Sequence, residues 1–239
     1  GVGADTLIGG EGNDTYFVDN VTDVVVELAS KGTDIVFSSI AYTLLDDVEN
    51  LTYTGVANVS LTGNSVANII DGSSGGNNTI SGGQGNDFID GGQGDDNLNG
   101  GAGNDRVEGG SGDDIVLGPG GNDDLNGDGD NDRVNGGSGN DVVAGGSGHD
   151  IVVGGYGNDL TYGDDGDDRM YGGRGQDRLM GGDGLDRLYG GSSRDVLGGG
   201  DDRDFLNGGL GQDSLYGGNG WDQLFGHQAN ALLVGGTGS

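Results

Sequence analysis

Short apolar stretches alternate with longer stretches rich in glycine and aspartate, and from Gly82 to Phe225 this alternation has a strict period of nine residues. Sixteen consecutive units follow the pattern G-G-x-G-x-D-x-U-x, where U is apolar in every unit but the one that contains Thr161. Side chains alternate between the two faces of a strand, so position 8 is the one inward residue of each short strand. A repeat this regular predicts strands that stack, unit upon unit, into an elongated solenoid.

The composition agrees with a repeat architecture. Glycine supplies 60 of the 239 residues, and its nine-residue spacing argues against both a disordered glycine-rich chain and collagen, which needs glycine at every third position. Positions 2 and 4 are each glycine in 13 of the 16 units, which indicates turns with positive φ angles. Because each unit buries one side chain for nine ordered backbones, the apolar core is too thin to hold the coils together by itself.

The aspartate that occupies position 6 of every unit suggests what else holds the turns. If two units make one coil, an aspartate such as Asp87 lies beneath Asp105 of the next coil, and their charges repel unless a cation lies between them. Carboxylate and carbonyl oxygens, without cysteine or histidine ligands, suit a hard cation, and a flexible cage of six or more oxygens favours Ca²⁺ over Mg²⁺. Sixteen units give fourteen such pairs, so about 14 Ca²⁺ ions are expected in the regular block.

The units resemble the RTX repeats of bacterial proteins exported by type I secretion, a family of toxins, proteases, lipases, epimerases, adhesins and surface-layer proteins. The resemblance covers residues 82–225 and two more units within residues 1–17, which carry Asp5 and Asp14. It implies an all-β fold, a right-handed parallel β-roll (a β-solenoid) with 18-residue coils and calcium in the turns. It also implies a secreted or cell-surface protein that folds on calcium outside the cell.

The same resemblance assigns metal ligands residue by residue. A representative site would join two coils through the carboxylates of Asp87 and Asp105 and the carbonyls of Gly83, Gly85, Gly100 and Ala102. The implied aspartate ligands of the whole chain are Asp14, Asp87, Asp96, Asp105, Asp114, Asp123, Asp132, Asp141, Asp150, Asp159, Asp168, Asp177, Asp186, Asp195, Asp204, Asp213 and Asp222.

Residues 18–81 break the nine-residue phase. They contain apolar runs such as Val24–Val26 and Ile35–Phe37, bounded by Gly, Asn and Asp, which predict strands. The expected division is therefore two repeat units at 1–17, an interposed β-rich segment at 18–81, the calcium roll at 82–225 and degenerate repeats at 226–239. The interposed segment is interpreted as solenoid without metal, and a separate ligand-binding module is the alternative. Both ends of the sequence fall inside a unit, which suggests a window from a longer protein.

Departures from the pattern predict weaker sites. Asp130, Ser193 and Asp202 replace glycine at position 4, where a residue with a Cβ at positive φ is strained. At position 2, glycine is replaced by Pro119, Asp128 and Asp164. In the unit 226–234, position 6 is Ala231, so no calcium is expected there.

Positions 7 and 9 of each unit point outward. On the even-numbered units, counted from Gly82, Arg169 and Tyr171 are expected directly beneath Arg187 and Tyr189. Such columns are interpreted as ladders that stabilise the sheet. The alternative is a packing surface for a second copy of the chain or for a glycan.

No catalytic constellation is evident, because Gly72–Gly76 matches G-x-S-x-G without the helix and the nearby histidine that a nucleophile elbow needs. The net charge of −31 argues against nucleic acid and anionic membranes as partners, and no apolar run suggests a membrane span. The sequence predicts a non-enzymatic calcium-binding segment of a secreted or surface protein, with self-assembly into a surface layer, fibre or adhesin as an option. The alternative is the C-terminal roll domain of a secreted enzyme or toxin whose catalytic domain lies outside this chain.

Overall fold

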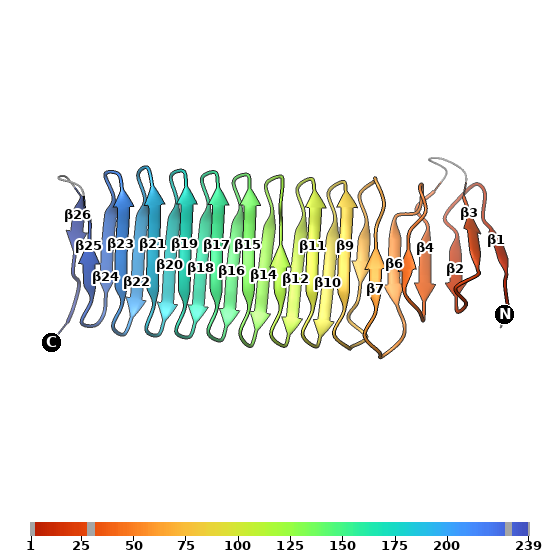
Figure 1. Ribbon diagram of the computed structural model, residues 1–239, viewed down its shortest axis with the longest axis horizontal. Coiled ribbons are helices and arrows are strands. Elements are labelled where there is room, and N and C mark those ends of the chain that lie inside the picture. Colours follow the sequence, from red (N-terminus) through yellow and green to blue (C-terminus); the bar gives the residue numbers. More distant parts are fainter. Residues whose placement is uncertain (1–2, 28–31, 228–230, 239) are drawn as a thin grey trace.

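The computed structural model describes residues 3–27, 32–227 and 231–238. These residues contain strands and no helix, and the strands pair in parallel in sheets that run the length of the molecule. Figure 1 shows the strands standing side by side along the long axis, with the N-terminal strands at one end and the C-terminal strands at the other. The predicted all-β parallel solenoid is confirmed.

Two long sheets and one short sheet make up the solenoid. The 13-stranded sheet contains, in spatial order, β2 (Thr15–Val18), β4 (Ile35–Ser38), β6 (Asn50–Tyr53), β8 (Ile69–Asp71), β10 (Phe88–Gln93), β12 (Arg106–Ser111), β14 (Asp124–Gly129), β16 (Val142–Ser147), β18 (Leu160–Asp165), β20 (Arg178–Asp183), β22 (Val196–Asp201), β24 (Ser214–Gly218) and β26 (Leu232–Val234).

The 11-stranded sheet contains β5 (Tyr42–Thr43), β7 (Ser60–Thr62), β9 (Thr79–Gln84), β11 (Asn97–Ala102), β13 (Ile115–Leu117), β15 (Arg133–Ser138), β17 (Ile151–Tyr156), β19 (Arg169–Arg174), β21 (Arg187–Ser192), β23 (Phe205–Leu210) and β25 (Gln223–Phe225). The two-stranded sheet at the N-terminal end pairs β1 (Thr6–Ile8) with β3 (Val24–Val26).

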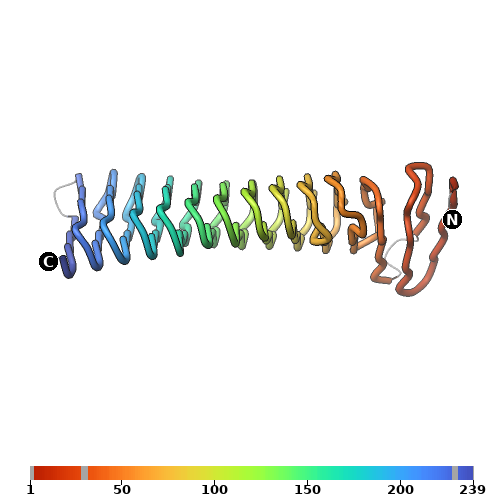
Figure 2. Tube along the Cα trace, turned by 90° about the horizontal axis from the view of Figure 1, so that it is seen from below, coloured from red at the N-terminus to blue at the C-terminus, as the bar shows by residue number. Residues whose placement is uncertain are grey.

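Within the regular block each coil consists of two units. Partner residues on both sheets lie two units apart, as in Ile89 with Val107 and Leu98 with Val116, so the predicted 18-residue coil is confirmed. Odd-numbered units supply the strands of the 13-stranded sheet and even-numbered units those of the 11-stranded sheet. Seen from below, the chain winds as a flattened coil along the long axis (Figure 2).

The core is a double row of position-8 side chains between the two sheets. From Ile89 to Leu215 these side chains are at most 1% exposed. Thr161, the polar exception, is also fully buried at the same position. Each coil therefore contributes two core residues, as the alternation of apolar and polar positions predicts.

Departures at the turns have visible structural effects. Asp130, Ser193 and Asp202 adopt φ angles of 77°, 93° and 74°, so the expected strain at position 4 is present. Strand β13 stops at Leu117, before Pro119, whereas its neighbours β11 and β15 each extend for six residues. The proline ring restricts φ to negative values and leaves no N–H group, so Pro119 can neither adopt the positive φ of position 2 nor donate to the ladder.

The strands of residues 18–81 join the same ladders with a different spacing. The runs predicted at Val24–Val26 and Ile35–Phe37 form β3 and most of β4. Along the 13-stranded sheet, Ile35 pairs with Thr15 on one side and with Asn50 on the other, so the two successive coils are unequal in length. Variable coil length explains why a nine-residue period is not visible in this segment. Among the described residues, no helix is long and apolar enough to cross a membrane.

Candidate metal centres

The structure brings the aspartates of successive coils together, one above the next. In all fourteen pairs of the regular block, the backbone N–H of one aspartate donates a hydrogen bond to Oδ1 of the corresponding aspartate in the next coil. The donor–acceptor distances lie between 2.7 and 3.1 Å. These bonds hold each carboxylate in a fixed orientation, and they form two columns, one at each edge of the solenoid.

The second carboxylate oxygen of these aspartates has no partner. Oδ2 is buried and without a hydrogen bond in every position-6 aspartate from Asp87 to Asp222, and likewise in Asp14. A buried carboxylate oxygen without a donor is costly, and its recurrence in all sixteen units means that the turns share one unmet requirement. A cation that accepts oxygen ligands meets that requirement, which is the chemistry that the sequence suggests.

Glycine at position 1 leaves room for these oxygens. A Cβ added to Gly109 would lie 2.6 Å from Asp114 Oδ2 and 2.6 Å from the carbonyl oxygen of Gly127 in the next coil. Both distances are too short for a carbon atom, so any other residue would displace the carboxylate or the carbonyl. The φ of Gly109 is not in the left-handed region, so glycine serves here to keep two oxygens from successive coils next to each other.

One predicted carbonyl ligand of the representative site, that of Gly100, lies close to a carboxylate, and a second, that of Ala102, accepts a hydrogen bond between the coils. The carbonyl of Gly100 lies beside Asp87 Oδ2, at the place that a side chain on Gly82 would fill. The Ala102 carbonyl accepts a hydrogen bond from the Gly85 N–H at 2.9 Å, which leaves one of its two lone pairs for a metal. The residues of the turn thus fit a site with hard oxygen ligands.

The other two predicted carbonyl ligands face the next coil. The carbonyl oxygen of Gly83 lies where a side chain on Gly101 would stand, and that of Gly85 lies where a side chain on Gly103 would stand. Gly101 and Gly103 also have positive φ angles, so glycine is required there for both space and backbone conformation.

Burial raises the pKa of the position-6 carboxyls from Asp87 to Asp204. Loss of solvation is the largest cause, and the charges of neighbouring aspartates add to it, whereas the hydrogen bond from the backbone N–H acts in the opposite direction. The pKa rises to about 8 for Asp132, about 7 for Asp114 and about 6 for Asp87. Without metal, the folded roll therefore keeps protons on these carboxyls up to a higher pH than an unfolded chain does.

This pKa shift predicts that acid stabilises the calcium-free roll. The pKa of aspartate in an unfolded chain is about 3.9, so the folded state binds more protons between that value and its own raised pKa. The contribution to stability is fully present below about pH 4 and is lost as the pH rises through about 6 to 8. Circular dichroism in calcium-depleted buffer should show less β-structure at about pH 9 than at about pH 5. A β-signal that grows with pH over this range would contradict the prediction.

The column of position-6 side chains continues into residues 18–81 with other residue types. The N–H of Asp14 donates to Asp34 Oδ1 at 2.8 Å, and the N–H of Asp34 donates to a carboxylate oxygen of Glu49 at 2.8 Å. Further along, the N–H of Asn68 donates to Asp87 Oδ1 at 2.8 Å. Sequence analysis missed Asp34, Glu49 and Asn68 because their coils differ in length. The signal that could have found them is an acidic or amide residue two positions before a buried apolar one.

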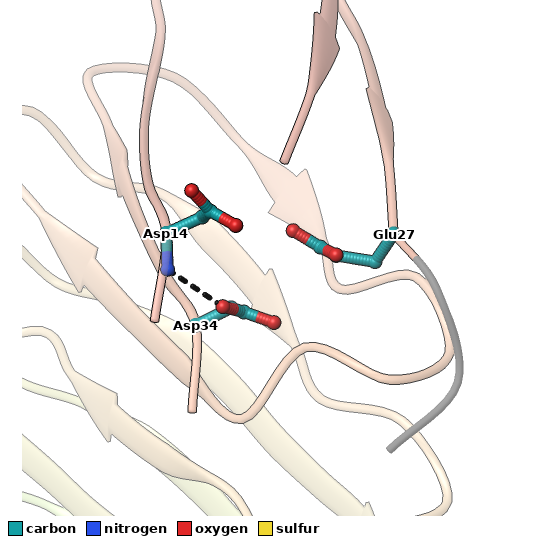
Figure 3. A group of neighbouring side chains, drawn as sticks. All are labelled: Asp14, Glu27 and Asp34. Atoms are coloured by element: carbon teal, nitrogen blue, oxygen red, sulfur yellow. Dashed lines mark hydrogen bonds between the residues drawn. The ribbon is translucent and has the colours of Figure 1, made fainter. Parts of the chain in front are cut away.

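Three carboxylates converge at the N-terminal end of this column. Ligand oxygens of Asp14, Glu27 and Asp34 lie within 4.8 Å of one another, and Figure 3 shows the three side chains meeting between neighbouring coils. Asp34 is 2% exposed. A Cβ on Gly9 would meet both Asp14 Oδ2 and Glu27 Oε1. In the regular turns the corresponding place is taken by the carbonyl oxygen of the position-1 glycine in the next coil, and here an oxygen of Glu27 takes it instead. Among the predicted ligands, Asp14 is the one that this group contains.

A second ladder, which sequence analysis also missed, lies at position 5. This position holds Asn or Asp in nine of the sixteen units. Its side-chain oxygens accept hydrogen bonds from the backbone N–H one coil further on, as in Asn122 to Asn140 at 2.7 Å and Asn140 to Asn158 at 2.8 Å. These hydrogen bonds connect the turns of successive coils without involving the position-6 carboxylates.

Comparisons with known proteins agree with this geometry. The model of the family described as RTX calcium-binding nonapeptide repeat (4 copies) matches residues 1–25 and, in overlapping segments, residues 62–233. The chain is 40% identical over 70 residues to Endo-1,3-1,4-beta-glycanase ExsH and 39% identical over 67 residues to Endo-1,3-1,4-beta-glycanase EglC, both of Rhizobium meliloti (strain 1021). These matches cover 29% and 28% of this chain but 15% and 14% of the two glycanases. The chain thus corresponds to a small part of each relative.

Proposed function

This chain belongs to the family of RTX calcium-binding nonapeptide repeat proteins, and we propose that it is a calcium-dependent structural segment of a secreted or cell-surface protein. The observation that supports this most strongly is the recurrence of a buried, unpartnered Oδ2 at every position-6 aspartate of residues 82–225. RTX repeats are typical of secreted proteins. The segment would be open in the low calcium of a cytosol and would close at extracellular calcium.

The proposed ions lie between the paired aspartates of neighbouring coils. Fourteen pairs in residues 82–225 would hold about 14 Ca²⁺, whose charge of about +28 nearly offsets the net charge of −31. Before calcium binds, repulsion along the chain favours an extended state suited to export. Residues 18–81 are proposed as solenoid coils without these regular sites, and residues 226–234 lack the site because position 6 is Ala231.

We expect the calcium dependence of folding to fall between cytosolic and extracellular concentrations. Proteinase K should degrade the chain at about 0.1 µM free calcium and leave it largely intact at about 2 mM, because sensor-type to extracellular calcium sites bind in the micromolar to millimolar range. A control digestion of an unrelated, calcium-independent protein separates effects on the protease from effects on the substrate. Equal resistance at both concentrations would contradict the proposal.

The second candidate function is the repeat region of a longer secreted enzyme. The similarity to two proteins named endo-1,3-1,4-beta-glycanases favours it, and those proteins are much longer than the matched segments. No catalytic role is proposed for this chain itself. Assaying the full-length gene product for hydrolysis of mixed-linkage β-glucan, with and without this segment, separates the two candidates.

Beyond calcium, the proposed partners are a second copy of the chain or a glycan. Self-association would lead to a surface layer, fibre or adhesin stalk. Sedimentation of the calcium-loaded chain tests this directly, because an assembling segment gains mass with concentration and a lone segment does not.

A further inference from the structure

One outer face of the solenoid differs in charge from the rest of the chain. We define the arginine-tyrosine face as positions 7 and 9 of the even-numbered units between residues 115 and 225. These positions lie on the odd-numbered strands from β13 to β25, which belong to the 11-stranded sheet. These positions hold Arg133, Arg169 and Arg187 and no carboxylate, although the net charge of the chain is −31. On the opposite sheet the same positions within this range hold Asp124 and one arginine, Arg178, and the units before residue 115 add Asp90, Arg106 and Glu108. A carboxylate-free face on so acidic a chain needs a physical reason.

The two central arginines of this face lie side by side. Arg169 and Arg187 are register partners on β19 and β21, and both are exposed. Adjacent parallel strands are about 4.8 Å apart, so the two like charges repel unless an anion lies between them. In the part of the chain that the structure describes, the ion pair that involves an arginine is Arg106 with Glu108, on the opposite sheet. Arg169 and Arg187 are therefore exposed, and among the described residues neither has a carboxylate in ion-pair contact.

Aromatic rings form a row beside the arginines. Tyr171 and Tyr189 stack with ring centroids 5.1 Å apart and planes 11° apart, as the column expected from the sequence requires. The row continues from Tyr189 to Phe205 at 5.7 Å and from Phe205 to Phe225 at 5.2 Å. Ring stacking fixes these side chains, so the surface is rigid before any partner binds.

Beside Arg187, one margin of this face is hollowed. A hollow of about 290 Å³ is lined by basic, amide and aromatic side chains, namely Arg187, Arg203, Phe205 and Gln223. Its acidic lining consists of the exposed Asp167 and of two buried position-6 aspartates, Asp186 and Asp204, whose charge the proposed calcium would offset. Guanidinium and amide groups beside a flat ring can donate hydrogen bonds to hydroxyl and carboxylate oxygens while the ring packs against C–H groups. This combination suits a sugar ring that carries an anionic group.

From these observations we infer that the arginine-tyrosine face binds an anionic polysaccharide. The charged positions recur along the axis at multiples of the strand spacing, which suits a linear polymer with regularly placed carboxylates. A symmetric dimer through this face would bring the same surface of both copies together, and that surface contains arginines and no carboxylate to pair with them. The inference rests on the proposed function, because the face exists when the roll is folded.

The test uses a charged and an uncharged form of one polymer. The full chain at about 2 mM calcium should bind carboxymethyl dextran in isothermal titration calorimetry and should bind unmodified dextran at least about ten-fold more weakly. The double variant R169Q/R187Q should lose about ten-fold or more in affinity, the scale expected for two charge-assisted contacts. The control R106Q/R178Q removes two arginines from the opposite sheet and should stay within about two-fold of the parent. Added salt should weaken binding because exposed charges are screened.

Outcomes other than these would overturn the inference. Equal binding of dextran and carboxymethyl dextran, or equal losses of affinity in the two double variants, would show that the arginines of this face do not bind the carboxylates of the polymer. Calcium-dependent dimers that dissociate in R169Q/R187Q would identify a second copy as the occupant instead. Circular dichroism of the same samples separates the two proposals. If the chain folds on calcium but does not bind the polymer, the inference fails alone, whereas a chain that does not respond to calcium contradicts the proposed function.

Discussion

Removing calcium should unfold most of the chain. In EGTA at about pH 7.5, circular dichroism should show a largely disordered spectrum, and added calcium should restore the β-signal in one steep transition. The physical reason is the column of buried carboxylates, whose Oδ2 atoms have no partner in the protein and whose charges repel from coil to coil. One core side chain per unit cannot offset that cost.

Magnesium provides the control for this experiment. Mg²⁺ requires near-ideal octahedral geometry at about 2.0–2.1 Å and loses its waters reluctantly, whereas Ca²⁺ accepts irregular cages at about 2.3–2.6 Å. Equal concentrations of Mg²⁺ should therefore restore little of the β-signal. A chain that is fully folded in EGTA, or that folds equally well on magnesium, would contradict a calcium-held roll.

Replacing a central aspartate should weaken calcium binding more than replacing a terminal one. Asp150 accepts the N–H of Asp132 and donates its own N–H to Asp168, so it takes part in two pairs. Asp222 accepts the N–H of Asp204 and takes part in one aspartate pair of the regular block, the last in its column. Asp150→Ala should raise the calcium midpoint about ten-fold, and Asp222→Ala should raise it clearly less, because stacked coils are coupled to their neighbours.

A matched control removes one negative charge without touching the column. Asp167 is exposed at position 5, next to the buried Asp168, and Asp167→Asn should leave the calcium midpoint nearly unchanged. Equal shifts for Asp150→Ala and Asp222→Ala would count against the stacked arrangement. An equally large shift for Asp167→Asn would show that net charge, rather than the ligand column, controls the midpoint.

The structure of the regular block is predictable from the sequence because the repeat spacing alone determines which side chains point inward and which aspartates stack. A nine-residue period with one apolar position places Val143 and Val152 inward, and a coil of two units places Asp132 beneath Asp150; the structure shows these relations. The reason for glycine at position 1 was missed, since it depends on where the carboxylate of the same turn lies and not on the backbone angle.

The irregular segment was less predictable for a different reason. Coils of unequal length carry the same column through Asp34, Glu49 and Asn68, but variable length hides the spacing by which a repeat is recognised. Glu27 reaches the first turn from outside the repeat pattern altogether, so contact in three dimensions identifies it and spacing does not.

Crystals of the calcium-loaded chain, measured for the anomalous signal of calcium, test the central claim most directly. We expect two rows of peaks along the edges of the solenoid, each peak lying between the carboxylates of paired aspartates in neighbouring coils, with about 14 in residues 82–225 and none at Ala231. A roll that is folded without peaks at the aspartate columns, or with calcium bound elsewhere, would contradict it.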